Sequence, residues 1–402
     1  MVEIKNLNKA AKKIKEAILS NKNIIIFADS DLDGASSAII LKEAIENFSL
    51  IKTKDKVLPK IDFYFPSRIK EGYGLNKSAL SYLKKKFLFS GKNKKKPLII
   101  TLDCGIGNFK EVDLARKIGF DVLIIDHHEV LKKTPKANLI VDPKQKGDKY
   151  PFKEFSNAGL TFKLAQEILK GNLSKALEKN FLELVALATI ADMMPQVGEN
   201  KLLINAGLKD IDNSPRPGIK AFFEILDKDS FSTKNEMIRQ IVSALNTSTV
   251  ENHIHLAFSL LTAINLEEAK DMAKDLLEKN KIRHQNIKLL EKEIKEKVLK
   301  SQKKSPIVFL GSSSFPLELL GSVASMICKE FQKPVFLFQI QSSVVQGVVR
   351  VPSGFDGVKL MEKCSKLLKT YGGHPKAAGF SVKQENLDKF KGCLIKQLIT
   401  SK

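Results

Sequence analysis

The sequence predicts an α/β protein with a mostly parallel sheet in its N-terminal domain, a long connecting helix and a smaller C-terminal α/β domain. Three observations carry this prediction. Apolar runs typical of buried strands alternate with amphipathic segments up to about residue 210. The charged stretch Leu266–Lys303 contains neither Gly nor Pro, as expected of one long helix. Apolar runs and helical spacing then resume.

The N-terminal domain holds five candidate strands, each an apolar run bounded by polar residues. They are Ile24–Phe27, Ile61–Phe65, Leu98–Leu102, Asp121–Ile125 and Ala137–Val141. Helical spacing of apolar residues predicts helices over Ala35–Asn47, Lys77–Lys86, Phe109–Ile118, Ser156–Leu169 and Leu173–Ile190. The lysine-rich segment Lys84–Lys96 predicts an exposed loop or helix end. Strands that alternate with helices favour a parallel sheet covered on both faces.

The C-terminal domain repeats this alternation on a smaller scale. Its candidate strands are Ile307–Leu310, Val335–Ile340 and Val344–Val351, and its candidate helices are Leu320–Phe331 and Val358–Leu368. We therefore place the domain boundaries at 1–245 for a catalytic domain, 246–304 for a helical linker and 305–402 for a substrate-binding domain.

Composition limits the class of protein. With 67 Lys and Arg against 45 Asp and Glu, the formal charge is +22, which suits a polyanionic partner; the codon bias of an AT-rich genome is the alternative cause. No apolar run reaches membrane-spanning length, so no membrane association is expected. The cysteines show no disulfide framework or zinc-type spacing, which predicts a reducing, cytoplasmic location. They are Cys104, Cys328, Cys364 and Cys393.

Ionisable residues directly follow three of the predicted strands, where a parallel sheet forms its ligand crevice. The three groups are Asp29, Asp31 and Asp33, then Asp103, then Asp126, His127 and His128. Side chains two apart in extended backbone face the same way, so Asp31 and Asp33 can reach one site. A turn that caps the following helix is the alternative, but it explains only one or two of the carboxylates.

A fourth carboxylate, Asp192, closes a largely apolar helix that ends before Pro195. Buried helices rarely carry an unpaired charge, so Asp192 needs a partner. Asp103 taken alone fits a helix cap, but beside Asp31 and Asp33 it fits a bridging carboxylate. The set can hold two metal ions about 3.5–4 Å apart, which is the chemistry of in-line phosphoryl displacement. Mixed carboxylate and imidazole ligands favour Mn²⁺, with Mg²⁺ as the alternative.

Taken in order, these motifs resemble the DHH phosphoesterase superfamily, and within it the RecJ family of single-strand-specific 5′→3′ exonucleases. The matching motifs are Asp29–Gly34, Pro66–Arg68, Glu71–Leu75, Asp103–Ile106, Asp126–His128, Ala188–Pro195, Glu199–Asn200 and Arg216–Ala221. Near the C-terminus, Gly372-Gly373-His374 with Ala377-Ala378-Gly379 resembles the signature of the DHHA1 domain. The resemblance spans nearly the whole chain.

The resemblance implies a role for each residue of the motifs. The implied metal ligands are Asp31, Asp33, Asp103, His127 and Asp192, with Asp103 as the bridge and Asp29 as a further ligand or an outer-shell group. His128 would contact the scissile phosphate, and Asp126 would orient the two histidines. The implied substrate contacts are Arg68, Arg350 and a loop formed by Gly372, Gly373 and His374; a plain turn is the alternative reading of that loop.

Two segments depart from the RecJ pattern. Leu245–Val250 lacks the glycine and arginine of an Asn-Ala-Ala-Gly-Arg-like motif, and Ser314–Gly321 is an eroded His- and Gly-rich motif. No OB-fold, which would supply a stacking groove, is expected after the Gly372 motif.

The function implied is Mn²⁺-dependent 5′→3′ hydrolysis of single-stranded nucleic acid, DNA in preference to RNA, with a single-strand-binding protein or a helicase as a candidate partner. Two alternatives stay open. One is a nanoRNase-like or cyclic-dinucleotide phosphodiesterase that acts on short oligonucleotides. The other is a noncatalytic nucleic-acid-binding protein, against which the intact acidic set argues.

Overall fold

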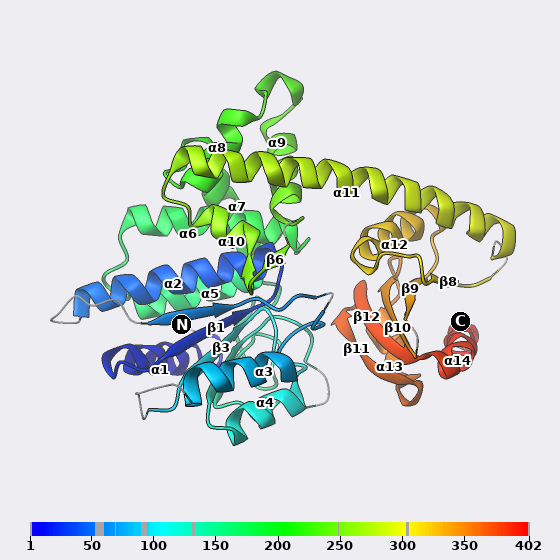
Figure 1. Cartoon of the computed structure of the whole chain (residues 1–402), viewed down its shortest axis with the longest axis horizontal. Helices are drawn as coiled ribbons and strands as arrows, with labels where there is room; N and C mark the ends of the chain where they lie inside the picture. Colours follow the sequence, from blue (N-terminus) through cyan, green and yellow to red (C-terminus); the bar gives the residue numbers. More distant parts are fainter. Residues whose placement is uncertain are drawn as a thin grey trace. The chain divides into compact units, whose positions relative to one another are not determined.

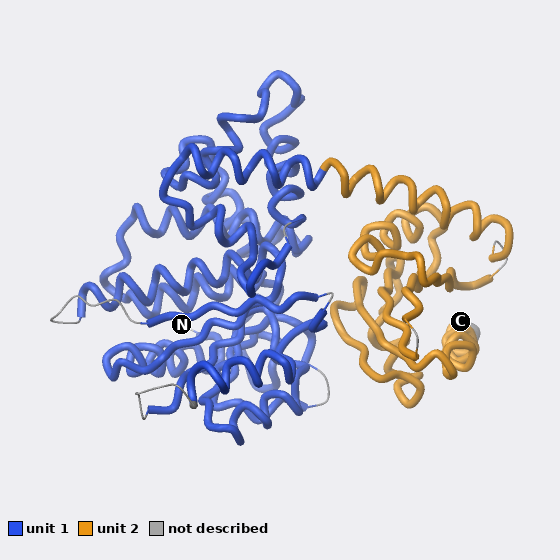
Figure 2. Tube along the Cα trace, in the orientation of Figure 1, with its two compact units in different colours: residues 1–280 blue, residues 281–402 orange. Residues whose placement is uncertain are grey.

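The computed structural model describes residues 2–52, 60–68, 70–89, 95–130, 133–247, 249–302, 305–341 and 343–400. The chain divides into two compact units, residues 1–280 and 281–402 (Figure 2). Helix α11 (Leu266–Ser301) runs across the division, close to the predicted connecting helix. The predicted fold class is confirmed for both units. The boundaries drawn from the sequence at residues 245 and 304 remain a prediction.

The first unit is built on a five-stranded sheet in the order β2-β1-β3-β4-β5, and every neighbouring pair in it is parallel. Its strands β1 and β3 are labelled in Figure 1. The strands are β1 (Ile24–Ala28), β2 (Ile61–Tyr64), β3 (Leu98–Leu102), β4 (Asp121–Ile125) and β5 (Leu139–Val141). All five predicted strands are therefore present. Strands β1 and β3 are buried along their whole length, which explains their unbroken apolar sequences.

Alternate residues of the strands face two separate hydrophobic clusters. In β1, Ile24 and Ile26 face the larger cluster, whereas Ile25 and Phe27 face the smaller one. The helices around the larger cluster include α1 (Leu7–Leu19), α2 (Leu32–Lys52), α5 (Asn157–Ile168) and α6 (Lys175–Ala191). The smaller cluster is covered by α3 (Lys77–Lys84) and α4 (Phe109–Lys117). Both faces of the sheet are thus covered.

The rest of the first unit, for which the sequence predicted no separate elements, is mainly helical and packs on the larger cluster. It contains α7 (Gly198–Leu208), α8 (Pro217–Ile225), α9 (Lys234–Leu245), the hairpin β6 (Val250–Glu251) and β7 (Ile254–His255), and α10 (Leu256–Leu261). The turn of the hairpin places Asn252 and His253 in the left-handed region, with φ of 50° and 62°. Both positive φ angles match the two-residue turns that suit strand twist.

The second unit contains a mixed five-stranded sheet in the order β11-β12-β10-β9-β8. Its strands are β8 (Val308–Ser312), β9 (Val335–Gln341), β10 (Val344–Arg350), β11 (Leu368–His374) and β12 (Ala377–Lys383), and only β8 and β9 pair in parallel. Helix α12 (Leu317–Phe331) packs on this sheet together with the last turns of α11, and α13 (Gly357–Glu362) and α14 (Leu387–Thr400) complete the unit.

Three expectations need correction in the second unit. The helix predicted over Val358–Leu368 ends at Glu362, because the chain turns after Cys364 and enters β11. The Gly372–His374 segment is the end of strand β11 rather than a loop, since His374 pairs with Ala377 across a two-residue turn. Cys364 and Cys393 form a disulfide. Their separation of 29 residues carries no local pattern, because the contact between α13 and α14 brings them together.

Within the described part of the chain, no helix is both long enough and apolar enough to cross a membrane. Residues 90–94 of the lysine-rich segment lie outside the described residues, as do Ser248 of the Leu245–Val250 segment and Lys303 of the predicted connecting helix.

Candidate metal centre

Aspartates stand at the same level at the carboxyl ends of four neighbouring strands. Ala28 pairs with Leu102, Leu102 with Ile125, and Ile125 with Val141. The residue that follows each of these four strands is an aspartate, and the four are Asp29, Asp103, Asp126 and Asp142. Sequence analysis found the first three and missed Asp142, although Val141-Asp142 shows the same pattern of an apolar strand followed by a carboxylate.

Asp103 lies at the centre of this edge. Asp103 belongs to three groups of described side chains whose ligand atoms lie within 4.8 Å of one another. The groups are Asp29, Asp31 and Asp103, then Asp33, Asp103 and His127, then Asp103, Asp126 and His128. The backbone of Asp103 is left-handed, with φ of 60°, which is uncommon for a residue other than glycine and points to a functional constraint. This is the geometry expected of a carboxylate shared by two ions.

His127 is held with one nitrogen turned toward the carboxylates. Its Nδ1 lies 2.7 Å from the Phe155 carbonyl oxygen, which only accepts, so Nδ1 carries the proton. Its Nε2 lies 3.0 Å from Asp103 Oδ1 and 3.7 Å from Asp192 Oδ2. In the neutral ring the Nε2 lone pair is thus available to a metal ion among these oxygens.

Asp126 organises the loop that carries both histidines. Its Oδ1 accepts from the backbone N–H groups of His127 and His128 and lies 2.8 Å from His128 Nδ1. Its Oδ2 accepts from Ile106 N at 2.9 Å. Burial works against the charged carboxylate, but His128, with His127 and the Ile106 N–H group, outweighs it and lowers the pKa of Asp126 to about 2. Burial also opposes the charged form of His128, but the Asp126 carboxylate outweighs it and raises the pKa of His128 to about 9.

Asp33 receives the N-terminus of helix α5. Its two oxygens accept from the backbone N–H groups of Asn157 and Ala158, each at 2.7 Å, where the helix dipole favours negative charge. Even so, burial and the neighbouring carboxylates of Asp192 and Asp31 raise the pKa of Asp33 well above its ordinary value. Burial, Asp31 and Asp33 raise the pKa of Asp103 in the same way. The site holds more negative charge than its protein donors balance.

Arg68 partly balances the carboxylates of the first strand end. Its guanidinium donates twice to Asp29, from Nε to Oδ1 at 3.2 Å and from Nη2 to Oδ2. Nη2 also donates to Asp31 Oδ2 at 2.8 Å. Burial opposes ionisation of Asp31, but Arg68 outweighs it and lowers the pKa of Asp31. For Asp29, burial prevails over Arg68 and the pKa is raised. Arg68, expected from the resemblance to contact phosphate, thus neutralises two candidate ligands.

Asp192 caps the C-terminus of α6 and turns toward the same cluster. Its Oδ2 has no hydrogen-bond partner among the described residues although it is buried. Burial and the charge of Asp31 raise the pKa of Asp192 to about 7. A buried carboxylate oxygen without a donor, beside several carboxylates of raised pKa, fits a bound cation. The residues present therefore suit the predicted divalent metal, and His127 adds the nitrogen ligand typical of Mn²⁺.

Three further residues lie at or beside this cluster and had no predicted role. Tyr73 donates from its hydroxyl to the Asp103 carbonyl oxygen at 2.9 Å. Asn246 Oδ1 accepts from Leu32 N at 3.2 Å, at the start of the helix that carries Asp33. Burial lowers the pKa of His255 to about 4, and this ring lies near Asp31. Tyr73 belongs to the Glu71–Leu75 motif, so the sequence contained a signal that could have identified it. Asn246 and His255 are brought near the cluster by the fold alone.

The remaining predicted substrate contacts belong to the second unit. Arg350 ends β10, where its Nε donates to Ser325 Oγ at 3.0 Å and its Nη1 to its neighbour's carbonyl oxygen, that of Val349, at 2.9 Å. Gly372, Gly373 and His374 form the end of β11. Gly373 has a φ of 126°, and an added Cβ there would approach Ala377 O to 2.7 Å. Close pairing of the two strands therefore requires glycine at this position.

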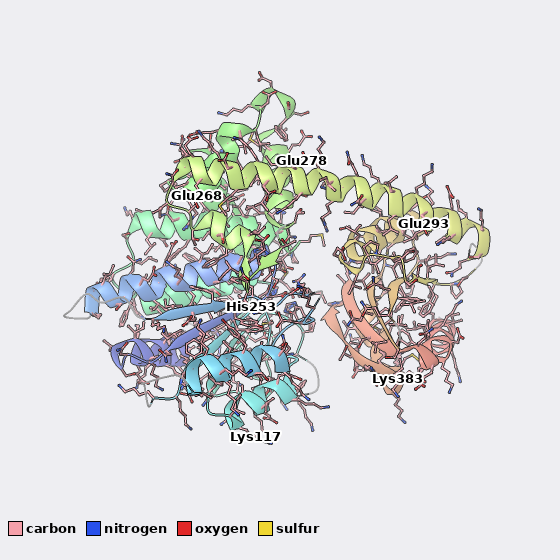
Figure 3. All side chains as sticks on the ribbon, viewed as in Figure 1. Lys117, His253, Glu268, Glu278, Glu293 and Lys383 are labelled. Carbon is pink, nitrogen blue, oxygen red and sulfur yellow. A yellow bond between two sulfur atoms is a disulfide. The ribbon has the colours of Figure 1, made fainter. Side chains whose placement is uncertain are left out.

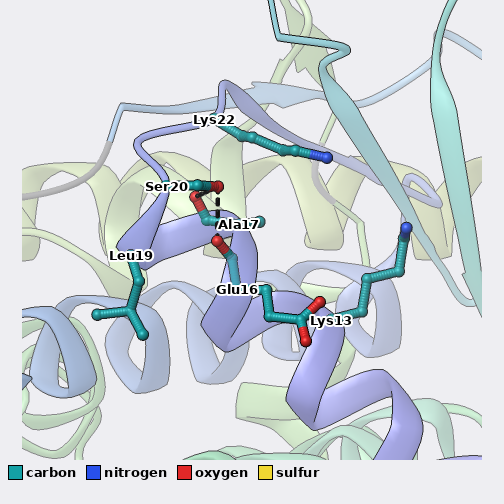
Figure 4. Close-up of a pocket in the computed structure, with 6 residues that line it drawn as sticks. All are labelled: Lys13, Glu16, Ala17, Leu19, Ser20 and Lys22. Carbon is teal, nitrogen blue, oxygen red and sulfur yellow. Dashed lines mark hydrogen bonds between the residues drawn. The ribbon is translucent and has the colours of Figure 1, made fainter.

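A surface pocket of about 450 Å³ is lined by residues of α1 and of the segment between α1 and β1, near the amino-terminal end of β1 (Figure 4). Lys13 and Lys22, which line it, both form ion pairs with Asp121, the first residue of β4. Their charges are therefore partly neutralised, and the pocket is distinct from the cluster at the strand ends.

Two family models match the chain. The model described as the DHH family, N-terminal domain, matches residues 23–189, and the DHHA1 domain model matches residues 307–400. Among curated proteins, the single-stranded-DNA-specific exonuclease RecJ of Bacillus subtilis is 32% identical over 96% of this chain, and that of Escherichia coli is 26% identical over 97%. The chain spans 47% of the first relative's length and 68% of the second's.

Solved structures give the same picture. A crystal structure of exonuclease RecJ bound to manganese superposes with a TM-score of 0.74 at 26% identity, over 98% of this chain and 95% of that one. RecJ of Thermus thermophilus in complex with Mn²⁺ gives a TM-score of 0.75 at 24% identity, over 98% of this chain and 55% of the other. The second comparison bears on the fold alone.

Proposed function

We propose that the chain, whose residues 23–189 match the DHH family model and whose residues 307–400 match the DHHA1 domain model, is a Mn²⁺-dependent exonuclease that removes nucleotides from the 5′ end of single-stranded nucleic acid. The observation that carries the proposal is the position of Asp103, which is shared by three potential ligand groups at the strand ends. The similarity to single-stranded-DNA-specific exonucleases supports the choice of substrate.

The proposal assigns a role to each side chain of the centre. Asp31, Asp33, His127 and Asp192 would hold two divalent cations with Asp103 shared between them, and Asp29 would be a further or outer-shell ligand. The two ions would supply an activated water and charge stabilisation at the phosphorus. His128, with the pKa that Asp126 raises to about 9, presents a protonated ring to the scissile phosphate near neutral pH.

Substrate contacts outside the centre are part of the same proposal. Arg68 changes partners from Asp29 and Asp31 to phosphate when cations compensate those carboxylates. Arg350, Gly372, Gly373 and His374 form the phosphate-binding part of the C-terminal domain, within residues 305–402. We further propose DNA as the preferred strand, a cytoplasmic location, Mg²⁺ as an alternative ion, and a single-strand-binding protein or helicase as a partner.

The test uses purified protein with Mn²⁺ on single strands labelled at either end, long and very short, of DNA and RNA. Early release of a labelled mononucleotide from the 5′ end of long DNA is the expected result. Release from the 3′ end contradicts the polarity. Cleavage confined to oligomers of a few nucleotides would replace the proposal with a nanoRNase-like activity, and binding without cleavage would replace it with a noncatalytic role.

A further inference from the structure

Glu71 lies outside the acidic cluster, and none of the roles assigned above uses it. Its side chain is 11% exposed. Among the described residues, its one basic ion-pair partner is His253, whose Nδ1 lies 3.8 Å from Glu71 Oε2. A carboxylate this buried requires other donors. Those donors identify what Glu71 does.

The donors come from separate parts of the first unit. Tyr64, the last residue of β2, donates from its hydroxyl to Glu71 Oε1 at 2.5 Å. The backbone N–H of Ser67 donates to Oε2 at 2.8 Å. Ser78, in the first turn of α3, places its Oγ 3.2 Å from Oε1. One side chain thus joins a strand end, a loop and a helix start.

The hairpin β6–β7 reaches the same point. The His253 carbonyl oxygen accepts from Phe65 N at 3.0 Å, and the His253 ring stacks on Tyr64 with centroids 4.1 Å apart. Figure 3 labels His253 within the first unit. The loop that follows β2 is therefore fixed from the hairpin side through Phe65 and from the helix side through Glu71.

This loop carries two groups that act on the metal centre. Arg68 contacts Asp29 and Asp31, and Tyr73 contacts the Asp103 carbonyl oxygen. Ser67, whose N–H is held by Glu71, immediately precedes Arg68. Arg68 also lies 5.9 Å from the centroid of the Tyr73 ring. The anchor at Glu71 thus lies between the two residues that touch the cluster.

We propose that Glu71 is a positioning residue, which sets Arg68 and Tyr73 against the metal centre by holding the loop after β2. Its catalytic part rests on the proposed function. A carboxylate suits this task because both oxygens accept and neither donates. A glutamine can keep its oxygen on the Ser67 N–H only if its NH₂ group turns to the Tyr64 and Ser78 hydroxyls, which must then accept instead of donate. It also loses the negative charge that strengthens all three hydrogen bonds.

The test compares Glu71→Gln with Glu43→Gln as a matched control. Glu43 is also a largely buried carboxylate, 21% exposed, and pairs with both terminal nitrogens of Arg216 at 2.9 and 3.1 Å. Within the described residues, its carboxylate forms no hydrogen bond or ion pair with the loop after β2. Both substitutions remove a charge from a carboxylate that satisfies several donors, but only Glu71 holds the loop.

The first measurement does not depend on activity. In hydrogen exchange followed by mass spectrometry, Glu71→Gln should speed exchange of the peptide covering residues 65–75 by about tenfold or more, as local opening becomes easier. Glu43→Gln should speed exchange near Arg216 and leave that peptide unchanged. Unaltered exchange of residues 65–75 in Glu71→Gln would overturn the proposal, whether or not the wild-type protein hydrolyses nucleic acid.

The second measurement is the hydrolysis rate at saturating Mn²⁺ and oligonucleotide, alongside the melting temperature. Glu71→Gln should lower kcat about a hundredfold, the scale of a 1 Å displacement of a catalytic group, with no larger loss of melting temperature than Glu43→Gln. Glu43→Gln should keep kcat within about twofold. The catalytic part would be overturned if kcat of Glu71→Gln stayed within twofold of wild type. It would also be overturned if kcat fell in both variants in proportion to their loss of melting temperature. An inactive wild type instead refutes the proposed function.

Discussion

Single ionisable groups at the metal centre have shifted proton affinities, and the direction of each shift predicts how stability depends on pH. Burial and nearby carboxylates raise the pKa of Asp192 to about 7 and that of Asp142 to about 8. Asp126 raises the pKa of His128 to about 9. In each case the folded-state pKa lies above the unfolded one, so the contribution to stability is lost as pH rises through the folded value.

We therefore predict that the metal-free protein loses melting temperature steadily between pH 5 and pH 9. Saturating Mn²⁺ should flatten this loss, because the cation replaces the proton as partner of Asp192 and the other ligands. Differential scanning calorimetry with and without Mn²⁺, in buffers of equal ionic strength, measures both profiles. A metal-free protein that gains stability toward pH 9 would contradict these shifts. The lowered pKa of His255, about 4, opposes this loss only below its ordinary value of 6.5, where Asp192 and Asp142 together outweigh it. The lowered pKa of Asp126, about 2, acts only below this range.

Much of the residue-level site could be predicted from the sequence, and the reason is geometric. Strands in a parallel sheet end at one edge, so residues that follow them converge without knowledge of the loops. The structure brings together Asp29, Asp31, Asp33, Asp103, His127, His128 and Asp192. The roles assigned to these residues remain predictions. The partners that orient them, such as the Phe155 carbonyl oxygen for His127, were not predictable because tertiary packing places them.

At the scale of elements, the entry into α2 is fixed by a close backbone approach. An added Cβ on Gly34 would lie 2.2 Å from Asp29 O, so this turn of α2 packs directly on the chain that leaves β1. Asp31 and Asp33 both lie in sequence between the two residues of this contact. Glycine is thus required here for close approach rather than for an unusual φ angle.

Replacing Gly34 with alanine should push α2 away from Asp29 and disturb both carboxylates. We expect a loss of about 1–3 kcal/mol in unfolding free energy, as for overpacked cores, and Mn²⁺ binding weaker by about 10-fold to 100-fold, as when groups that orient ligands are lost. Urea unfolding and isothermal titration with Mn²⁺ measure the two effects. Gly107→Ala is the control, because a Cβ there meets nothing within 4 Å; equal effects in both variants would contradict the packing argument.

The strands and most helices of the sheet region followed from apolar periodicity, whereas the elements between α6 and α11 did not. This region consists of short helices and a hairpin with two strands of two residues each, and its apolar residues pack on the larger cluster from several directions. Short segments give few repeats of a periodic pattern, so their boundaries depend on contacts distant in sequence. The hairpin matters nonetheless, since it brings His253 and His255 beside the loop and carboxylates of the centre.

For the whole molecule, an acidic centre sits in a strongly basic chain. The formal charge is +22, whereas the candidate site gathers carboxylates whose pKa values are mostly raised by burial and by one another. Basic residues elsewhere attract a polyanion, but phosphate cannot approach the carboxylates until cations compensate them. The two features together favour nucleic acid as the substrate and make metal a condition for reaction.

Binding of single-stranded DNA should therefore weaken steeply with salt. For about five phosphate contacts, affinity should fall about a hundredfold between 50 and 200 mM salt, since the slope is about −0.7 per contact for single strands. Fluorescence anisotropy with the Asp103→Asn variant measures this without degradation of the strand. An affinity independent of salt would mean that the basic charge reflects codon usage rather than recognition.

The central claim is that Asp103 bridges two cations and is required for hydrolysis. Asparagine is the suitable replacement because it tolerates the left-handed backbone of this position while removing the charge. The decisive measurement is Mn²⁺-dependent release of 5′ label from single-stranded DNA by Asp103→Asn and by wild type, with circular dichroism to establish folding. We predict a folded variant whose rate falls by about six orders of magnitude or to background, a loss within the range of enzymatic rate enhancement. A folded Asp103→Asn protein that retains Mn²⁺-dependent hydrolysis would contradict the account.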